Sequence, residues 1–475
     1  MLSFDDYRRH DAVGLAALVS RGETSATELL DTALARCDAV EPRIRSVSQL
    51  HEDFARAAIR NGLPDGPLRG VPFLLKDVSV QLAGTVTTNG GRYFEGAVAE
   101  RDSTVVERYR RAGLVIFGKT MTPEMGLAAS TETSHKGSTR NPWNLERTAG
   151  GSSGGAAAAV AAGIVPAAQG SDGGGSIRIP ASCCGLFGLK PTRARVPLGP
   201  FVGESWGGMG VVHVLSRSVR DSAALLDATA GAAAGDPYAA PHQARPYLEE
   251  VGADPGRLRI AFQRRPVSGS PVDGECIAAA EDAARLLDSL GHHVEEATLP
   301  ATIDDIGPAA WALVATGVAA TLERRARMLG RPLEEHDVEP VTWRAVLHAR
   351  SLSALAHHEA LAAIHRHGRR MAEFRERHDI VLSPTLGQPP VPLGVQRMNN
   401  ADGEAYAAAL HRFTPFCNVF NMSGEPSMSV PLHWTVDGLP VGTMLSGAFG
   451  REDLLIRLGA QLERARPWFE RVPPL

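Results

Sequence analysis

Short apolar runs alternate with helical or glycine-rich stretches through most of the chain, and this alternation predicts buried strands flanked by helices. The strand-like runs cover residues 71–75, 114–117, 164–168, 258–262, 293–296 and 380–382. Helix formers or apolar periodicity mark residues 156–162 and 276–290 as intervening helices. The pattern therefore predicts an α/β fold.

The two ends of the chain differ from this alternation. The first 60 residues are predicted to be helical, with Ser25 and Glu28 forming a capping box at the start of an apolar-periodic run. Near the other end, residues 427–434 and 439–446 flank an Asp-Gly turn and predict a hairpin, before a last helix. Because no internal repeat or long linker interrupts the chain, we expect one domain. Its parts are N-terminal helices (1–60), a core (61–300), a mainly helical variable cap (301–378) and C-terminal strands with a helix (379–475).

Charge and cysteine content narrow the function classes. The 475 residues carry a formal net charge of −4, which argues against nucleic acid and anionic membrane as partners. The charged start MLSFDDYRRHD and the lack of about 18 unbroken apolar residues predict a protein that is neither exported nor membrane-spanning. Five cysteines without CxxC spacing argue against a disulfide framework and a zinc site. We expect a cytoplasmic protein without metal or cofactor.

Lysine is scarce in this chain. Only four of the 49 basic residues are lysines, so 49 − 4 = 45 are arginines. Arginine stays protonated, whereas a buried lysine can act as a neutral base. Each lysine is therefore a candidate for chemistry that arginine cannot perform; the four are Lys76, Lys119, Lys136 and Lys190.

Two serine-bearing glycine loops follow one another, GGSSGG at 150–155 and GSDGGGSIR at 170–178. Glycine runs let backbone N–H groups converge on one point, which can hold an oxyanion. Ser176 follows three glycines, where an attacking hydroxyl would meet an acyl carbon. Lys76 follows the apolar run 71–75, so burial should favour its neutral form. These features predict acyl-transfer chemistry without histidine.

The same motifs carry a family resemblance. Together with GVPFLLKD (70–77), GLKPT (188–192), NMSGEPSMSVPL (421–432) and GLPVGTMLSG (438–447), the two loops resemble the amidase signature family, the serine hydrolases that use Ser-Ser-Lys. The resemblance extends over essentially the whole chain. It implies the amidase-signature fold, a mixed twisted sheet covered by helices on both faces, and hydrolysis of carboxylic amides.

Carried over residue by residue, the resemblance implies Ser176 as nucleophile, Ser152 as bridging serine after a cis peptide bond, and Lys76 as general base. Ser153 would support Lys76 by hydrogen bonding. Asp172 and Arg178 flank the nucleophile loop and are expected to form a structural ion pair. The oxyanion hole would consist of the backbone amides of Gly173, Gly174, Gly175 and Ser176. Gly173 departs from the family, which more often carries Thr, Ala or Ile there, and this should widen the space beside the nucleophile.

Other interpretations of these residues remain open. Residues 151–155 also match the GxSxG elbow of α/β-hydrolases, which would make Ser153 the nucleophile, although no strand pattern precedes them. The glycines could also form a phosphate-binding loop, but the sequence contains neither the Walker A motif nor GxGxxG. His357, His358, Glu359 and His365 are more typical of a solvated helix face than of a metal site. A glutaminase-type subunit of a tRNA-dependent amidotransferase and a catalytically silent binding protein are further alternatives.

The substrate is the least determined feature. Residues predicted to line the pocket are Met125, Trp206, Trp311 and Cys417. Because few charged residues accompany them, we expect neutral, apolar or aryl acyl groups. DGGGSIRIPASCCG (172–185) resembles the branch acting on cyclic nylon-type amide oligomers, which also extends to aryl amides and carbamates. A small-molecule amide is thus the expected partner, and the sequence leaves a homodimer open.

Overall fold

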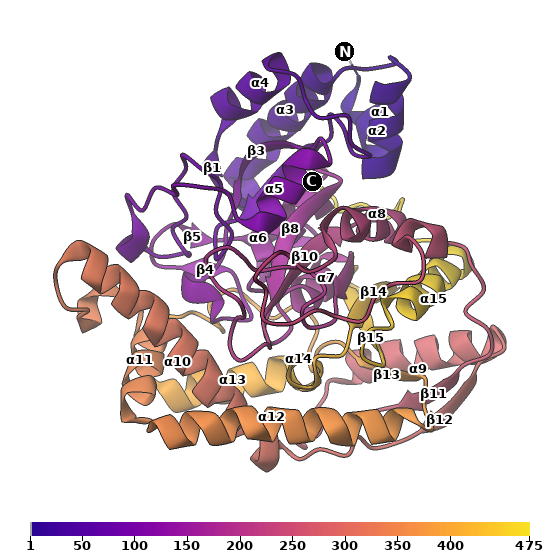
Figure 1. The fold of residues 1–475 in the computed structure, drawn as a ribbon. Coiled ribbons are helices and arrows are strands. Elements are labelled where there is room, and N and C mark those ends of the chain that lie inside the picture. Colours follow the sequence, from indigo (N-terminus) through magenta and orange to yellow (C-terminus); the bar gives the residue numbers. More distant parts are fainter. Residues whose placement is uncertain (1) are drawn as a thin grey trace.

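One mixed sheet runs through the middle of the protein in the computed structural model, which describes residues 2–475 (Figure 1). The eleven strands, in the order in which they lie across it, are β1 (Val47–Leu50), β3 (Val115–Thr120), β2 (Pro72–Lys76), β8 (Ala167–Asp172), β10 (Val211–Ser216), β9 (Phe187–Lys190), β14 (Ser427–Trp434), β15 (Pro440–Gly447), β13 (Ile380–Pro384), β11 (Arg259–Phe262) and β12 (His293–Glu296). Two small hairpins lie outside it, β4 (Glu132–Thr133) with β5 (Gly137–Ser138) and β6 (Arg140–Asn141) with β7 (Asn144–Thr148).

Helices cover both faces of the sheet. Along β2, Leu74 belongs to one buried apolar cluster, while its neighbours Phe73 and Leu75 belong to another, as expected when successive side chains point to opposite faces. The helices are α1 (Phe4–Arg8), α2 (Ala12–Ser20), α3 (Ala26–Ile44), α4 (Glu52–Arg60), α5 (Thr104–Arg111), α6 (Gly154–Ala161), α7 (Arg178–Cys184), α8 (Val219–Thr229), α9 (Gly274–Ser289), α10 (Ile303–Leu329), α11 (Pro340–Ser351), α12 (Ala354–Arg375), α13 (Gly403–Phe413), α14 (Asn418–Ser423) and α15 (Glu452–Ala465).

Local signals in the sequence account for several of these elements. The capping box of Ser25 and Glu28 begins α3, and the hairpin around the Asp-Gly turn is β14 with β15. The run 164–168 is only partly a strand, because β8 begins at Ala167 and then continues through polar residues up to Asp172. The N-terminal segment also contains β1 at the sheet edge, so the prediction of helices alone was wrong there. The predicted α/β fold with a mixed, doubly covered sheet is confirmed.

The predicted helical cap corresponds to α10, α11 and α12, with α11 and α12 both packed on α10 (Figure 1). Among the described residues, α10 alone is long and apolar enough, by length and composition, to cross a membrane. It packs on α11 and α12, and one of its faces lines the cavity described below. These contacts are those of a helix that packs inside the protein fold.

Candidate active site

The site forms where two parallel neighbouring strands end. Strands β2 and β8 pair in parallel through Leu74 and Ala168, so their carboxyl ends lie side by side. Lys76 is the last residue of β2, and Asp172 is the last residue of β8. Sheet pairing therefore places the lysine next to the start of the second glycine loop.

Lys76 is fully buried and faces two serine hydroxyls. Its Nζ lies 2.7 Å from Ser152 Oγ and 3.0 Å from Ser171 Oγ, and its backbone N–H donates to Gln169 Oε1. Burial lowers the pKa of Lys76 to about 7, although the negative charge of Asp172 opposes this shift. A substantial fraction of the amine is thus neutral near pH 7 and able to accept a proton.

The first glycine loop holds Ser152 after a cis Gly151–Ser152 peptide bond, as the family resemblance implied. Ser153 occupies the N-cap position of α6 without a capping hydrogen bond from its side chain, and its hydroxyl does not take the predicted place beside Lys76. Instead, Ser153 Oγ donates to the carbonyl of Ser171 and accepts from the amide of Ser171. Ser171, which the sequence analysis did not select, is the second hydroxyl at Lys76.

This placement also argues against Ser153 as the nucleophile of a GxSxG elbow. Its side chain is fully buried, and its hydroxyl is hydrogen-bonded to backbone. The strand that precedes it, β7, belongs to a small hairpin and not to the central sheet. Ser152, Ser171 and Ser176, in contrast, all line the cavity.

Ser176 ends the second glycine loop and is half-buried at the cavity. Its carbonyl accepts a hydrogen bond from the amide of Ser153, which joins the two loops. The amide of Gly175 donates to Asp172 Oδ1 at 2.7 Å, so the prediction that Gly175 contributes to an oxyanion hole was wrong. Within residues 2–475, the amides of Gly173, Gly174 and Ser176 have no hydrogen-bond acceptor and can receive an oxyanion.

The predicted ion pair of Asp172 and Arg178 is present and supports the second glycine loop. Both side chains are fully buried, and Arg178 Nη2 lies 3.0 Å from Asp172 Oδ1. Burial opposes ionisation of Asp172, but Arg178 outweighs it and keeps the pKa of that carboxyl well below its usual range. Asn421 completes the pair by donating to Asp172 Oδ1 and accepting from Arg178. The sequence analysis missed Asn421, although it lies in the quoted motif NMSGEPSMSVPL.

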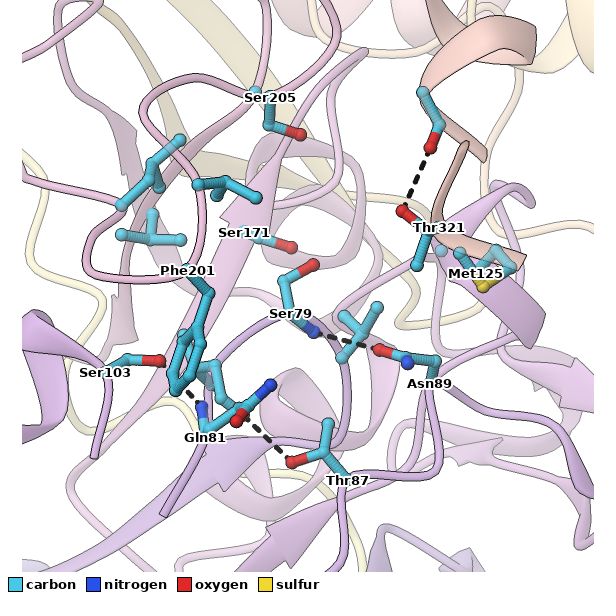
Figure 2. Close-up of a pocket in the computed structure, with 18 of the residues that line it drawn as sticks. Ser79, Gln81, Thr87, Asn89, Ser103, Met125, Ser171, Phe201, Ser205 and Thr321 are labelled. Atoms are coloured by element: carbon cyan, nitrogen blue, oxygen red, sulfur yellow. Dashed lines mark hydrogen bonds between the residues drawn. The ribbon is translucent and has the colours of Figure 1, made fainter. Parts of the chain in front are cut away.

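A cavity of about 580 Å³ opens from the serines toward the cap. Figure 2 shows the polar side chains of its wall, among them Ser79, Asn89 and Thr321, together with Ser171. The loop that follows β2, the segment 197–212 and one face of α10 supply most of the remaining wall. Segments that lie far apart in the sequence therefore form this pocket together.

Two of the four predicted pocket residues, Met125 and Trp206, line the cavity. Trp311 does not, because it is 39% exposed and its ring stacks on His348 at the surface of the cap. Cys417 is fully buried behind the nucleophile loop, where its carbonyl accepts from Arg178. Both predictions failed because helix and turn patterns give no information on the direction of a side chain relative to a distant loop.

The expected widening beside the nucleophile at Gly173 was also wrong. A Cβ atom at this position would lie 2.5 Å from Trp206 Cε3, so the indole occupies the space that a side chain would take.

Across residues 2–475, the His, Cys, Asp and Glu side chains form no group of three suited to a metal ion. All five cysteines are buried and unpaired.

A buried lysine amine that contacts two serines, with a third serine on a glycine loop at the same cavity, is typical of serine hydrolases that use lysine. The family described as Amidase matches residues 28–456, and the chain belongs to the amidase signature family. It is an amidohydrolase that acts on C–N bonds.

Known proteins agree with this assignment over the full length. The chain is 40% identical to the 6-aminohexanoate-cyclic-dimer hydrolase of Paenarthrobacter ureafaciens, over 98% of this chain and 96% of that protein. The solved structure of 6-aminohexanoate cyclic dimer hydrolase complexed with substrate matches with a TM-score of 0.92 and 38% identity, covering 99% of both chains. A bacterial aryl acylamidase of the same family matches with a TM-score of 0.87 and 27% identity, covering 97% and 98%.

Proposed function

We propose that Ser176 is the nucleophile of amide hydrolysis, Ser152 the bridging proton carrier and Lys76 the general base. The observation that carries this proposal is the 2.7 Å contact of the buried Lys76 amine with Ser152, which shares the cavity wall with Ser176. Neutral Lys76 accepts the proton of Ser152 while Ser152 accepts that of Ser176.

The covalent steps follow from these roles. Ser176 Oγ forms a bond to the acyl carbon, and the electron pair of the carbonyl moves to its oxygen. The amides of Gly173, Gly174 and Ser176 donate to that oxyanion. The C–N bond then breaks, and the departing amine receives the proton that the lysine had stored. Water next attacks the acyl-enzyme through the same relay and releases the carboxylic acid.

For the substrate, we propose a neutral amide with an extended apolar part, of the class of cyclic or linear oligoamides. From Gly317 to Met328, cavity-lining residues recur along one face of α10, a length of about 16 Å. At the outer end, Val98 is 57% exposed and Met328 73% exposed, although both are apolar. An exposed apolar mouth favours apolar ligands.

Charges at the cavity rim balance one another. The rim carries two acidic and two basic side chains, Glu100, Glu204, Arg324 and Arg325. No single charge sign is favoured, which supports a neutral substrate over an ionic one. The names of the relatives support the same class, since one acts on the cyclic dimer of 6-aminohexanoate and another on aryl amides.

A substrate panel tests this proposal. We expect kcat/KM to rise from acetamide to hexanamide and benzamide, and we expect hydrolysis of the 6-aminohexanoate cyclic dimer, because each buried methylene contributes about 0.8 kcal/mol. Free glutamine should be a poor substrate. If acetamide or glutamine proved best, the apolar-substrate proposal would fall, and a glutaminase-type subunit would be favoured.

The nucleophile is tested separately by phenylmethylsulfonyl fluoride. Peptide mass spectrometry should find the sulfonyl adduct on Ser176, and Ser176→Ala should be inactive on the whole panel. An adduct on Ser153 with Ser176 unmodified would overturn the assignment. A cytoplasmic location, expected from the cysteine pattern, stays a prediction, as does a homodimer.

A further inference from the structure

The indole of Trp206 lies between two glycines from different parts of the fold. One is Gly173 in the nucleophile loop, where a Cβ atom would lie 2.5 Å from Trp206 Cε3. The other is Gly317 on α10, where a Cβ atom would lie 2.5 Å from Trp206 Cδ1. Real Cβ atoms do not approach other atoms so closely, so the ring excludes a side chain at both positions.

Neither glycine is required by its own backbone. Gly173 does not have a φ angle in the left-handed range, and Gly317 lies inside α10, where alanine is the better helix former. Glycine at these positions is therefore explained by the contact with Trp206.

The turn that carries Trp206 is itself held firmly. Trp206 has a left-handed φ of 52°, which residues other than glycine rarely adopt. The amides of Gly208 and Gly210 both donate to the carbonyl of Ser205, and Arg193 Nε donates to the carbonyl of Gly208 at 2.7 Å. The backbone turn that carries the indole is thus held by hydrogen bonds before and after Trp206.

We propose that Trp206 is a positioning residue that fixes the oxyanion loop against the cap helix α10. A loop of three glycines has no side chains of its own to hold its amides in place. The indole packs on this loop at Gly173 and on α10 at Gly317, and it adds a side-chain contact to the hydrogen bonds that Asp172 and Ser153 make with the loop. The inference rests on the proposed function, since it takes the amides of Gly173 and Gly174 as oxyanion donors.

A mutant cycle tests the contact from both sides. Gly173→Ala should lower kcat/KM by about 10²-fold, because the clash of its methyl group with the indole displaces the loop. Gly317→Ala should also lower kcat, although it improves helix propensity, because it pushes the same ring toward the loop. In the Trp206→Ala background, which keeps a non-glycine residue at the same φ, both alanines should change kcat/KM by no more than about twofold.

Trp206→Ala alone should lower kcat more than it raises KM, since it frees the loop without removing the entry of the pocket. Trp206→Leu provides a second background should the alanine variant fold poorly. Phe201→Ala is the matched control, because Phe201 is an aromatic residue of the same cavity-lining segment, whereas the atoms nearest to a Cβ at either glycine belong to Trp206. It should not rescue Gly173→Ala.

The inference would be overturned if Gly173→Ala caused the same loss with and without Trp206, or no loss in either background. Rescue of Gly173→Ala by Phe201→Ala would overturn it as well. Sulfonyl labelling of Ser176 in the parent enzyme separates this failure from failure of the proposed function. Labelled Ser176 with an additive cycle refutes only the role of Trp206, whereas unlabelled Ser176 refutes the mechanism on which that role rests.

Discussion

Lys76 Nζ lies 2.7 Å from Ser152 Oγ, although 76 positions of sequence separate the two residues. The lysine comes from the end of a buried strand, and the serine from a glycine loop that precedes a buried helix. Among the described residues, the hydrogen bonds of the Lys76 amine are to the hydroxyls of Ser152 and Ser171. This contact is the basis of the first two predictions.

Lys76→Arg should be nearly as inactive as Lys76→Ala. A guanidinium stays protonated at any usable pH and cannot accept the serine proton, so we expect both variants to lose about 10²–10⁴-fold in kcat/KM. Circular dichroism should show that both remain folded. Retention of more than about a tenth of parent activity by the arginine variant would refute Lys76 as the base.

The pH dependence of kcat/KM should follow the same amine. Because burial lowers the pKa of Lys76 to about 7, the neutral, active form is lost as the pH falls below that value. We expect kcat/KM to fall about tenfold per pH unit below this pKa and to level off above it. A profile that is flat from pH 5 to 9 on an uncharged amide would contradict a lysine base.

Asp172→Asn should destabilise the fold strongly. The change leaves Arg178 as an uncompensated charge with no exposed surface, and such losses amount to about 3–5 kcal/mol. Urea unfolding at pH 7 measures this free energy. The surface pair of Arg350 and Glu323 serves as control, since both side chains are more than a third exposed and Glu323→Gln should cost less than about 1 kcal/mol. Similar losses for the two changes would argue against a structural role of the buried pair.

Met328→Ser should reduce selectivity for long substrates. Met328 lines the outer end of the cavity, so its loss should lower kcat/KM for hexanamide and larger amides, by up to about tenfold, and leave acetamide unchanged. Leu329→Ser is the control, because Leu329 is also an exposed apolar residue of α10 but does not line the cavity. If the two variants lowered kcat/KM for long amides equally, the apolar mouth would not explain specificity. The same holds if Met328→Ser lowered kcat/KM for acetamide as much as for long amides.

The sequence by itself determined those features that depend on neighbouring residues. The capping box at Ser25, the Asp-Gly hairpin and the apolar runs of β2 and β13 reflect local hydrogen bonding and periodicity, which a short window contains. The candidate residues Ser176 and Lys76 could also be selected from the sequence, because a glycine run before a serine and a lysine after a buried run are both visible within a few residues.

The tertiary structure decided which groups meet. Ser171 takes the place beside Lys76 that was expected of Ser153, because the direction of each hydroxyl depends on the pairing of β8 with β2. Cys417 and Trp311 turn away from the cavity, while Trp206 fills the space left by Gly173. Such contacts join segments that are not neighbours in the sequence, and their geometry follows from packing of the whole chain. A local pattern of polar and apolar residues contains no information about that packing.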